Sequence, residues 1–278
     1  MNAKIKKNVS GGKKEDVNAT FSERKGIAGF LETVIRRFRM ISHLVTLLPL
    51  YALCFLAMGI SAAPGIYFFD TIRSAASALP EALYYISVGT ALITAYFMYG
   101  ILLLFVVPLF NFLMPFRLKP FRGGFFTLET IPWYFHNAYT YMVRYTFLEF
   151  VTPTPLNMLF YKMMGMKIGK GSYINTTNIS DPGLIELGDN VTIGGSVYII
   201  AHYASKGYLI VDKVRIHDGV TIGLKATIMG DVEIGEGAVI GPHEVILPKS
   251  RIPAGRKPFE SLIKKEGLEK DQPSQDFL

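Results

Sequence analysis

Residues 210–252 read IVDKVRIHDGVTIGLKATIMGDVEIGEGAVIGPHEVILPKSRI, and an isoleucine falls on every sixth position. The isoleucines that share this phase are Ile210, Ile216, Ile222, Ile228, Ile234, Ile240, Ile246 and Ile252. An α-helix repeats every 3.6 residues and an ordinary strand every two, so neither accounts for a period of six. Such a period is typical of hexapeptide repeats, in which each repeat is a short parallel strand that ends in a turn.

Glycine and aspartate stand between these isoleucines, where such a chain has to turn. The pairs at these positions are Asp218-Gly219, Gly230-Asp231 and Glu236-Gly237, and glycine also follows Ile222, Ile234 and Ile240. Tight corners require backbone angles that these residue types adopt readily. If three repeats close one triangular coil, each isoleucine points inward onto the isoleucine of the next coil. The pattern therefore predicts an all-β left-handed parallel β-helix over residues 167–258.

The six-residue spacing also occurs earlier in the chain, in two shorter runs. Ile168 and Ile174 are in phase, as are Leu187, Ile193 and Ile199, but the step from Ile199 to Ile210 is 11 residues. We expect the chain to leave the coil at residues 201–208, which read AHYASKGY, and then to return. A loop on a rigid scaffold is a common place for catalytic residues.

Charge and hydropathy point to a membrane rather than to nucleic acid. The chain has 278 residues, a mean hydropathy of +0.30 and a net charge of +7, and ten Lys/Arg against four Asp/Glu precede Met40. Because this basic segment adjoins apolar spans, an anionic membrane surface explains it better, and no nucleic-acid partner is expected. The single cysteine, Cys54, excludes a disulfide or a cysteine-based metal site within one chain.

Two charge-free runs predict a transmembrane hairpin within residues 40–122. Residues 40–69 and 82–116 contain no Asp, Glu, Lys or Arg, and each exceeds the roughly 20 residues that span a bilayer as a helix. Two buried core helices are the alternative. Cations flank the outer ends of the hairpin and only Arg73 lies in its connection, so both termini and the β-helix are expected on the cytoplasmic side of an inner membrane.

The remaining segments complete the expected domain organisation. Residues 1–39 read as a basic tail and an amphipathic helix, which lies either on a membrane surface or against the protein. Residues 123–166 are rich in aromatic side chains and predict interfacial linker helices, and the sequence leaves open whether they enter the bilayer. Residues 259–278 form a charged C-terminal tail.

Among five histidines, His202 has the most suggestive position because it opens the segment where the repeat phase breaks. A histidine there could act as general base at neutral pH. The alternative is a histidine that merely packs the root of the loop. His217 and His243 are expected to be turn or surface residues.

Residues 168–258 resemble the hexapeptide-repeat acyltransferases, in particular the galactoside and maltose acetyltransferase branch. The matching motifs are LGDNVTIG at 187–194, VILPK at 245–249 and IPAG at 252–255. With the hairpin in front, the segments INTTNISD at 174–181 and IAH at 200–202 also resemble the membrane-bound C-terminal module of poly-lysine synthetase-type peptide synthetases.

The resemblance implies acyl transfer from a phosphopantetheine thioester, acetyl-CoA or another acyl-CoA, at the subunit interfaces of a homotrimer. His202 would be the base, and Asp181, Asn175 and Asn178 would orient the acceptor or the imidazole. Asp181 could equally cap a turn. No metal is expected. Direct attack on the thioester is expected, because no serine or cysteine is placed to form an acyl-enzyme.

The same resemblance suggests where the donor binds. The pantetheine arm would pass Gly223, Lys225 and Gly241, and the nucleotide phosphates would meet cations at the last coils. Those cations are Lys249, Arg251 and Arg256. The loop at residues 201–208 is shorter than in the sugar acetyltransferases and lacks their second adjacent histidine, which leaves the acceptor type open.

The sequence thus predicts a membrane-anchored acyltransferase that acts on a hydroxyl or amine of a lipid-linked or amphiphilic acceptor. Three alternatives stay open: a donor borne by a carrier protein, a non-catalytic trimeric scaffold, and a γ-type carbonic anhydrase. The last would use zinc on three histidines such as His202, His217 and His243, but the close histidine pair of that family is missing.

Overall fold

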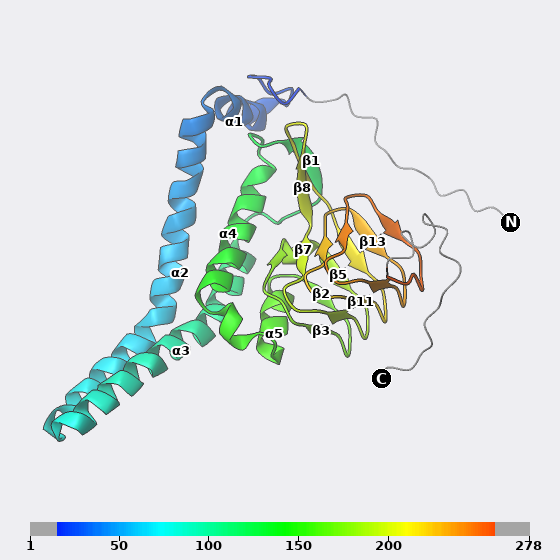
Figure 1. Ribbon diagram of the computed structural model, residues 1–278. Coiled ribbons are helices and arrows are strands. Elements are labelled where there is room, and N and C mark those ends of the chain that lie inside the picture. The colour runs from blue at the N-terminus through cyan, green and yellow to red at the C-terminus, as the bar shows by residue number, and fades with distance from the viewer. Residues whose placement is uncertain (1–15, 259–278) are drawn as a thin grey trace, which may run out of the picture.

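Helices dominate the first part of the chain and short strands the rest, in a computed structural model that describes residues 16–258 (Figure 1). The helices are α1 (Gly26–Arg37), α2 (Arg39–Ala75), α3 (Glu81–Leu113), α4 (Thr130–Thr146) and α5 (Pro155–Met163), with short 3-10 turns η1 (Ala76–Ala78), η2 (Leu148–Val151) and η3 (Pro182–Leu184). The strands before the phase break are β1 (Phe121–Gly124), β2 (Lys167–Ile168), β3 (Tyr173–Ile174), β4 (Ile179–Ser180), β5 (Ile185–Leu187), β6 (Thr192–Ile193) and β7 (Tyr198–Ile200). Those after it are β8 (His202–Ser205), β9 (Tyr208–Val211), β10 (Val214–Ile216), β11 (Thr221–Ile222), β12 (Thr227–Ile228), β13 (Val232–Ile234), β14 (Val239–Ile240), β15 (Val245–Ile246) and β16 (Arg251–Ile252).

The repeat region forms the predicted left-handed parallel β-helix. Its three parallel sheets have the strand orders β16-β13-β10-β5-β2, β14-β11-β6-β3 and β15-β12-β7-β4. Each sheet is one side of a triangular coil, and the coils stack along the axis of the domain (Figure 1).

Aliphatic side chains fill the inside of the coil in the register that the sequence predicts. Ile222 lies between Ile193 and Ile240 in one sheet, and Ile228 lies between Ile199 and Ile246 in another. These side chains are buried, so the β-helix is held by a continuous stack of aliphatic contacts. At one corner Gly219 and Gly237 follow each other on successive coils, both with positive φ (66° and 65°), a conformation that glycine adopts without strain.

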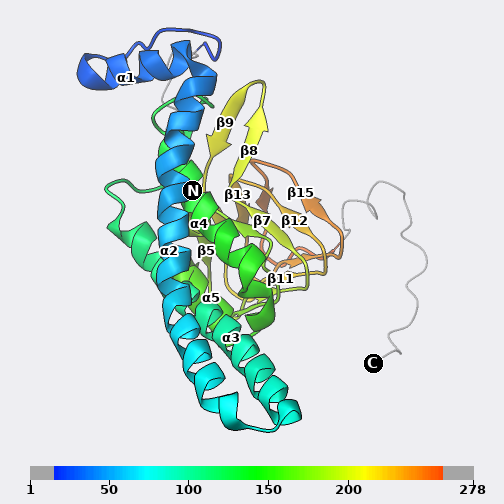
Figure 2. The same ribbon diagram turned by 90° about the vertical axis from the view of Figure 1, so that its left-hand side faces the viewer.

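Ile210 corrects the sequence prediction, because it does not belong to the stack. Ile210 lies in β9, which pairs antiparallel with β8 and with β1. The coil resumes only at Val214. The hairpin of β8 and β9 projects from the β-helix (Figure 2) and turns at Lys206 and Gly207, both with positive φ, as a two-residue hairpin turn requires. The six-residue spacing from Ile210 to Ile216 is therefore coincidental. It arises because β9, which lies outside the coil, leads directly into β10.

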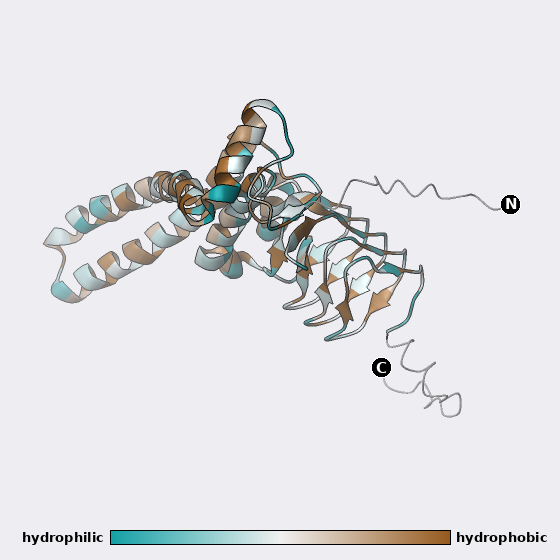
Figure 3. Ribbon diagram, turned by 90° about the horizontal axis from the view of Figure 1, so that it is seen from above, coloured by the Kyte–Doolittle hydropathy of each residue, from teal (hydrophilic) through white to brown (hydrophobic). Residues whose placement is uncertain are grey.

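The two charge-free runs form the long helices α2 and α3, which pack side by side and project away from the β-helix (Figure 3). Both are long and apolar enough to cross a membrane. Only 22% and 28% of their most apolar windows are buried within the protein. That exposure is unlike the core helix of a soluble protein, so it supports the transmembrane interpretation over the alternative of buried core helices.

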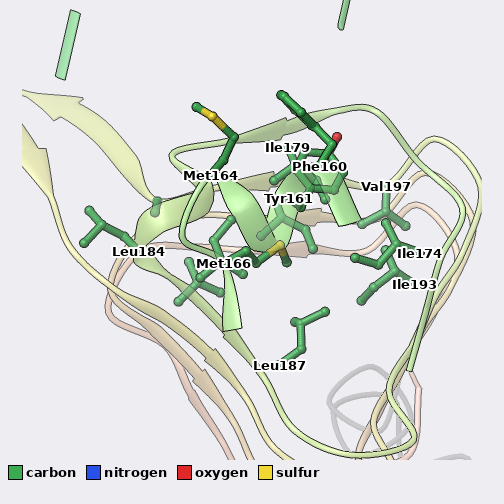
Figure 4. Close-up of a cluster of buried hydrophobic side chains, with 14 of the residues drawn as sticks. Phe160, Tyr161, Met164, Met166, Ile174, Ile179, Leu184, Leu187, Ile193 and Val197 are labelled. Carbon is green, nitrogen blue, oxygen red and sulfur yellow. The ribbon is translucent and has the colours of Figure 1, made fainter. Parts of the chain in front are cut away.

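The aromatic linker, residues 123–166, contributes side chains to the protein core. Helix α5 closes the first coil of the β-helix: Phe160, Tyr161, Met164 and Met166 pack onto Ile174 and its aliphatic neighbours (Figure 4). Other linker aromatics that are buried include Phe135, Tyr139 and Phe147. These rings therefore belong to the protein core, whereas Tyr145 and Phe150 of the same linker are exposed.

Helix α1 lies across the N-terminal end of α2 (Figures 1 and 2). Its polar residues Glu32 and Arg36 are buried and hydrogen-bonded to each other, whereas Ile27 is 80% exposed and Phe30 is also exposed. Among the described residues, this exposure favours a membrane surface over the protein as the contact of its apolar face. The expected basic tail before residue 16 and the tail at 259–278 lie outside them.

Candidate active site

Strand register brings Asp181 and His202 together. Strand β4 pairs with β7 so that Ser180 lies opposite Ile200. The turn η3 follows β4 and the β8–β9 hairpin follows β7, so Asp181 and His202 lie at the same corner of the coil. His202 is the first residue of β8, and its Nδ1 lies 2.5 Å from Oδ2 of Asp181. Asp181 is fully buried and has a left-handed backbone (φ 59°), while His202 is 21% exposed. A buried carboxylate thus orients a histidine that ligands can still reach.

Helix α4 supplies the second contact to the carboxylate. Nδ2 of Asn137 donates to Oδ1 of Asp181 at 2.6 Å, so both carboxylate oxygens are engaged. The ring of Trp133, one turn earlier on α4, meets the ring of His202 edge-on at 5.0 Å between centroids. Asn137 and Trp133 were not predicted as site residues. No sequence motif marks them, because they lie in the aromatic linker, far along the chain from His202.

The contact with Asp181 determines which ring nitrogen of His202 can act as a base. When the carboxylate is ionised, Nδ1 of His202 carries the proton and donates to it. The lone pair then lies on Nε2, the nitrogen on the other side of the ring. This is the arrangement in which a carboxylate holds an imidazole in one tautomer so that its free nitrogen can accept a proton from a nucleophile.

A second histidine, His136, lies beside the turn that carries Asp181. Its Nδ1 is 3.0 Å from Oδ1 of Asn111 on α3, and the backbone N–H of Gly183 in η3 donates to its Nε2 at 3.4 Å. Complete burial lowers the pKa of His136 to about 4, although the nearby Asp181 carboxylate acts in the opposite direction. His136 is therefore neutral near pH 7, and it ties the turn that carries Asp181 to helices α3 and α4.

The two asparagines predicted beside Asp181 lie elsewhere. Asn175 is exposed in the turn after β3, at a different corner of the coil. Asn178 is half-buried, and its Oδ1 accepts a hydrogen bond from Arg144 of α4. The structure brings only Asp181 of the three predicted acceptor-side residues into contact with His202.

The predicted donor residues are divided among the three corners of the coil. Gly223 and Gly241 stack on successive coils, with Lys225 in the same turn as Gly223. Lys249 and Arg251 lie at the corner that also carries Asp181 and His202, two to three coils further on. Arg256, at the third corner, is largely buried against Glu244.

Lys249 and Arg251 help to line a cavity of about 810 Å³ beside the β8–β9 hairpin. Arg122 of β1 and Lys206 of the hairpin turn line the same cavity, and neither was predicted as a site residue. Arg251 also binds Asp231 at 2.6 Å, so part of its charge is neutralised. Four cations and two carboxylates, Asp212 and Asp231, line this cavity, so the balance of charge is positive and suits phosphate groups.

The remaining histidines do not gather around His202. Nε2 of His217 lies 2.9 Å from Oε1 of Glu233, which lowers the pKa of Glu233, and His243 occupies a turn with positive φ. Within residues 16–258, no three His, Cys, Asp or Glu side chains converge as they would around a metal ion. The described residues therefore offer no counterpart of the three-histidine zinc site.

Fold and site together define a class: the chain is a left-handed β-helix protein of the hexapeptide-repeat type, with a histidine–carboxylate pair at the root of the β8–β9 hairpin and two long apolar helices in front. A comparison with models of known protein families finds no match. Individual relatives are nevertheless found.

The chain is similar to the Delta-poly-L-ornithine synthetase of Acinetobacter baumannii, at 23% identity over 59% of this chain and 12% of that protein. It is also similar to YvoF of Bacillus subtilis, whose name assigns it to the acetyltransferases, at 36% identity over 32% of this chain and 54% of that protein. These relatives confirm the resemblance to hexapeptide-repeat acetyltransferases and to poly-lysine synthetase-type enzymes. The chain spans about half of one relative and about an eighth of the other.

Among solved structures, the serine acetyltransferase (CysE) of Neisseria gonorrhoeae in complex with serine aligns with 68% of this chain and 93% of its own. The sequence identity is 18% and the TM-score is 0.29. A likeness of this size concerns the repeat fold and not the chemistry of the site.

Proposed function

We propose that this protein is a membrane-anchored acyltransferase in which His202 is the general base. The observation that carries this function is the hydrogen bond between His202 Nδ1 and buried Asp181, with Asn137 on the other carboxylate oxygen. The likeness to YvoF, which is named as an acetyltransferase, supports the same reaction class.

The reaction is direct transfer. The acceptor hydroxyl or amine attacks the thioester carbonyl carbon while Nε2 of His202 takes its proton, and a tetrahedral intermediate forms. When the intermediate collapses, the carbon–sulfur bond breaks and the imidazolium returns the proton to the thiolate. The products are an ester or amide and a free thiol. The Asp181 carboxylate stabilises the transient imidazolium.

The donor is acetyl-CoA or another acyl-CoA, with its phosphates near Lys249 and Arg251. These residues share the corner of the coil with His202, and the cavity beside them carries two further cations. Gly223, Lys225 and Gly241 lie at another corner, so they would meet the same donor only across a subunit interface, as in a homotrimer. A pantetheine arm on a carrier protein is the second donor candidate, because part of the charge of Arg251 is already neutralised.

The bilayer explains why such an enzyme would carry α2 and α3. We expect the hairpin to hold the β-helix at the cytoplasmic face of the inner membrane, where acyl-CoA is present, with α1 on the surface of the bilayer. The acceptor is then a lipid-linked or otherwise amphiphilic hydroxyl or amine.

Calorimetric titration of CoA and acetyl-CoA into the detergent-purified protein tests the donor site without knowledge of the acceptor. We expect saturable binding that His202→Ala retains and that Lys249→Ala weakens about tenfold, as for the loss of one charge-assisted hydrogen bond. Lys162→Ala, on the exposed face of α5, is the matched control. Absence of binding to the wild type would favour the carrier-borne donor or the scaffold.

Thiol release from acetyl-CoA, with dodecylamine and 1-dodecanol as surrogate acceptors, tests the base. His202→Ala should slow transfer by about 100- to 10,000-fold while the donor still binds, because a general base contributes that much. His243→Ala, in an exposed turn, should leave the rate unchanged. Equal transfer by His202→Ala and the wild type would remove His202 from the mechanism.

A further inference from the structure

An apolar cavity of about 670 Å³ lies between α2 and α4 and has His202 in its wall. Its volume is in the range of small-molecule binding sites. Residues of α2 from His43 to Met58 line it, so it extends for about 20 Å along this helix at 1.5 Å per residue. One leaflet of a bilayer core is about 15 Å thick, so the cavity is as long as a lipid chain that crosses one leaflet.

The two ends of the cavity differ in chemistry. Near the start of α4, the lining carries polar groups: Asn137 and Tyr134, with His202 against Trp133 and His43 edge-on to the Tyr134 ring at 5.3 Å. Further along both helices the walls are mainly apolar, with Cys54 and Met58 from α2 and Met142 from α4, although Tyr145 and Thr146 also line them. A ligand that fits both ends has a polar head beside His202 and a long hydrocarbon chain.

The cavity adjoins a surface that suits the hydrocarbon of a bilayer. Leu48 is 71% exposed on α2, and Leu44 and Phe55 are also exposed, while Phe55 lines the cavity as well. Helix α2 carries no charged residue from Met40 to Phe69. A chain could therefore pass from the bilayer into the cavity without crossing a charged or polar barrier.

We infer that this cavity holds the hydrocarbon chain of the acceptor, a membrane lipid whose polar headgroup carries the hydroxyl or amine to be acylated beside His202. Because it presupposes acyl transfer at His202, this assignment rests on the proposed function and specifies its substrate class. Each buried methylene contributes about 0.8 kcal/mol. The KM for 1-alkanols or alkylamines should therefore fall up to about fourfold per added carbon until the cavity is full.

Photo-crosslinking tests occupancy independently of activity. The full-length protein is reconstituted into nanodiscs of phosphatidylethanolamine and phosphatidylglycerol that contain a phosphatidylethanolamine with a diazirine in one acyl chain. Crosslinked peptides are then identified by mass spectrometry. We expect crosslinks on the cavity side of α4, around Ala138 and Met142, in addition to those on the outer surface of α2.

Matched variants distinguish a lipid in the cavity from lipid around the helices. Leu47 lines the cavity and Leu48 does not. Leu47→Trp should therefore reduce the α4 crosslinks at least fivefold, whereas Leu48→Trp should retain them. Ala138→Phe fills the cavity from the α4 side and should act like Leu47→Trp. Crosslinks confined to the outer face of α2, or α4 crosslinks equal in all variants, would overturn the assignment.

The same variants separate this inference from the proposed function. If Leu47→Trp lowers transfer to dodecylamine but leaves acetyl-CoA binding intact, the acceptor chain occupies the cavity. If Leu47→Trp and Leu48→Trp transfer equally well, the cavity is not the acceptor site, although acyl transfer stands. If α4 crosslinks appear but no acceptor is acylated, a lipid site remains and the proposed function fails.

Discussion

Asp181 combines three properties that rarely occur together in one side chain. It is fully buried, its backbone is left-handed, and its two oxygens bind groups from two separate parts of the chain, His202 and Asn137. A buried carboxylate without such partners would carry a large desolvation cost. The hydrogen bonds from the imidazole and the amide together explain how this position tolerates an acidic residue, and why turn capping alone does not account for it.

His136 leads to a prediction about pH. Its pKa in the folded protein, about 4, lies below the usual value of 6.5, so the unfolded chain binds the proton first as the pH falls. The protein should lose stability between about pH 6.5 and 4, on the order of 3 kcal/mol from this group, and gain none from it above pH 7.

Thermal unfolding in detergent across this pH range measures the effect. His136→Gln removes the titrating ring and should flatten the pH dependence, whereas His243→Gln, in an exposed turn, should retain it. An identical pH profile in wild type and His136→Gln would show that His136 titrates normally.

At the scale of elements, α4 links the long helices to the β-helix. It packs on α2 and α3, and through Asn137 it also contacts Asp181 of the His202–Asp181 pair. The contact with α3 depends on Gly100: a Cβ there would lie 2.0 Å from the ring of Phe147, the residue that caps the C-terminus of α4.

Gly100→Ala should therefore destabilise the protein by about 1–3 kcal/mol through overpacking, although alanine is the better helix former by about 1 kcal/mol. Gly89→Ala is the matched control in the same helix, because nothing lies within 4 Å of a Cβ at that position. It should be neutral or stabilising. Thermal unfolding of both variants measures the difference. Equal stability of Gly100→Ala and Gly89→Ala would mean that Phe147 moves aside without a loss of stability.

For the whole molecule, the outer surface of the β-helix carries apolar side chains that a monomer would leave in water. They gather at and beside the corner between two of its sheets and include Tyr173, Tyr198, Leu224 and Val245. Contiguous exposed apolar groups of this kind mark association surfaces. Since this corner also carries Gly223 and Gly241, association here would bring the predicted donor residues into an interface.

We therefore expect a homotrimer, with a protein mass of three times 31.0 kDa, about 93 kDa, by native mass spectrometry from detergent. Leu224→Glu should shift the population to monomer because it places a charge in the apolar interface. Lys206→Glu, at the exposed hairpin turn, should leave the trimer intact. A monomeric wild type at micromolar concentration would contradict this assembly.

The sequence alone determined the β-helix and the two long apolar helices. Both depend on short-range patterns: a six-residue aliphatic period that each coil repeats on its neighbour, and charge-free runs longer than a bilayer is thick. It also singled out His202, because a break in a regular repeat marks a loop. The same reasoning misplaced Ile210, since spacing cannot distinguish a coil strand from an antiparallel strand that continues into it.

Only the tertiary structure decided how the site is assembled. Asn137 meets Asp181 across 44 residues of sequence, and His136 meets Gly183 across 47, with no motif that pairs them. The cavity between α2 and α4 likewise depends on how the aromatic linker folds against both the hairpin and the first coil. Such contacts arise from the packing of distant segments, and the linker pattern is equally compatible with a membrane interface and with a protein core.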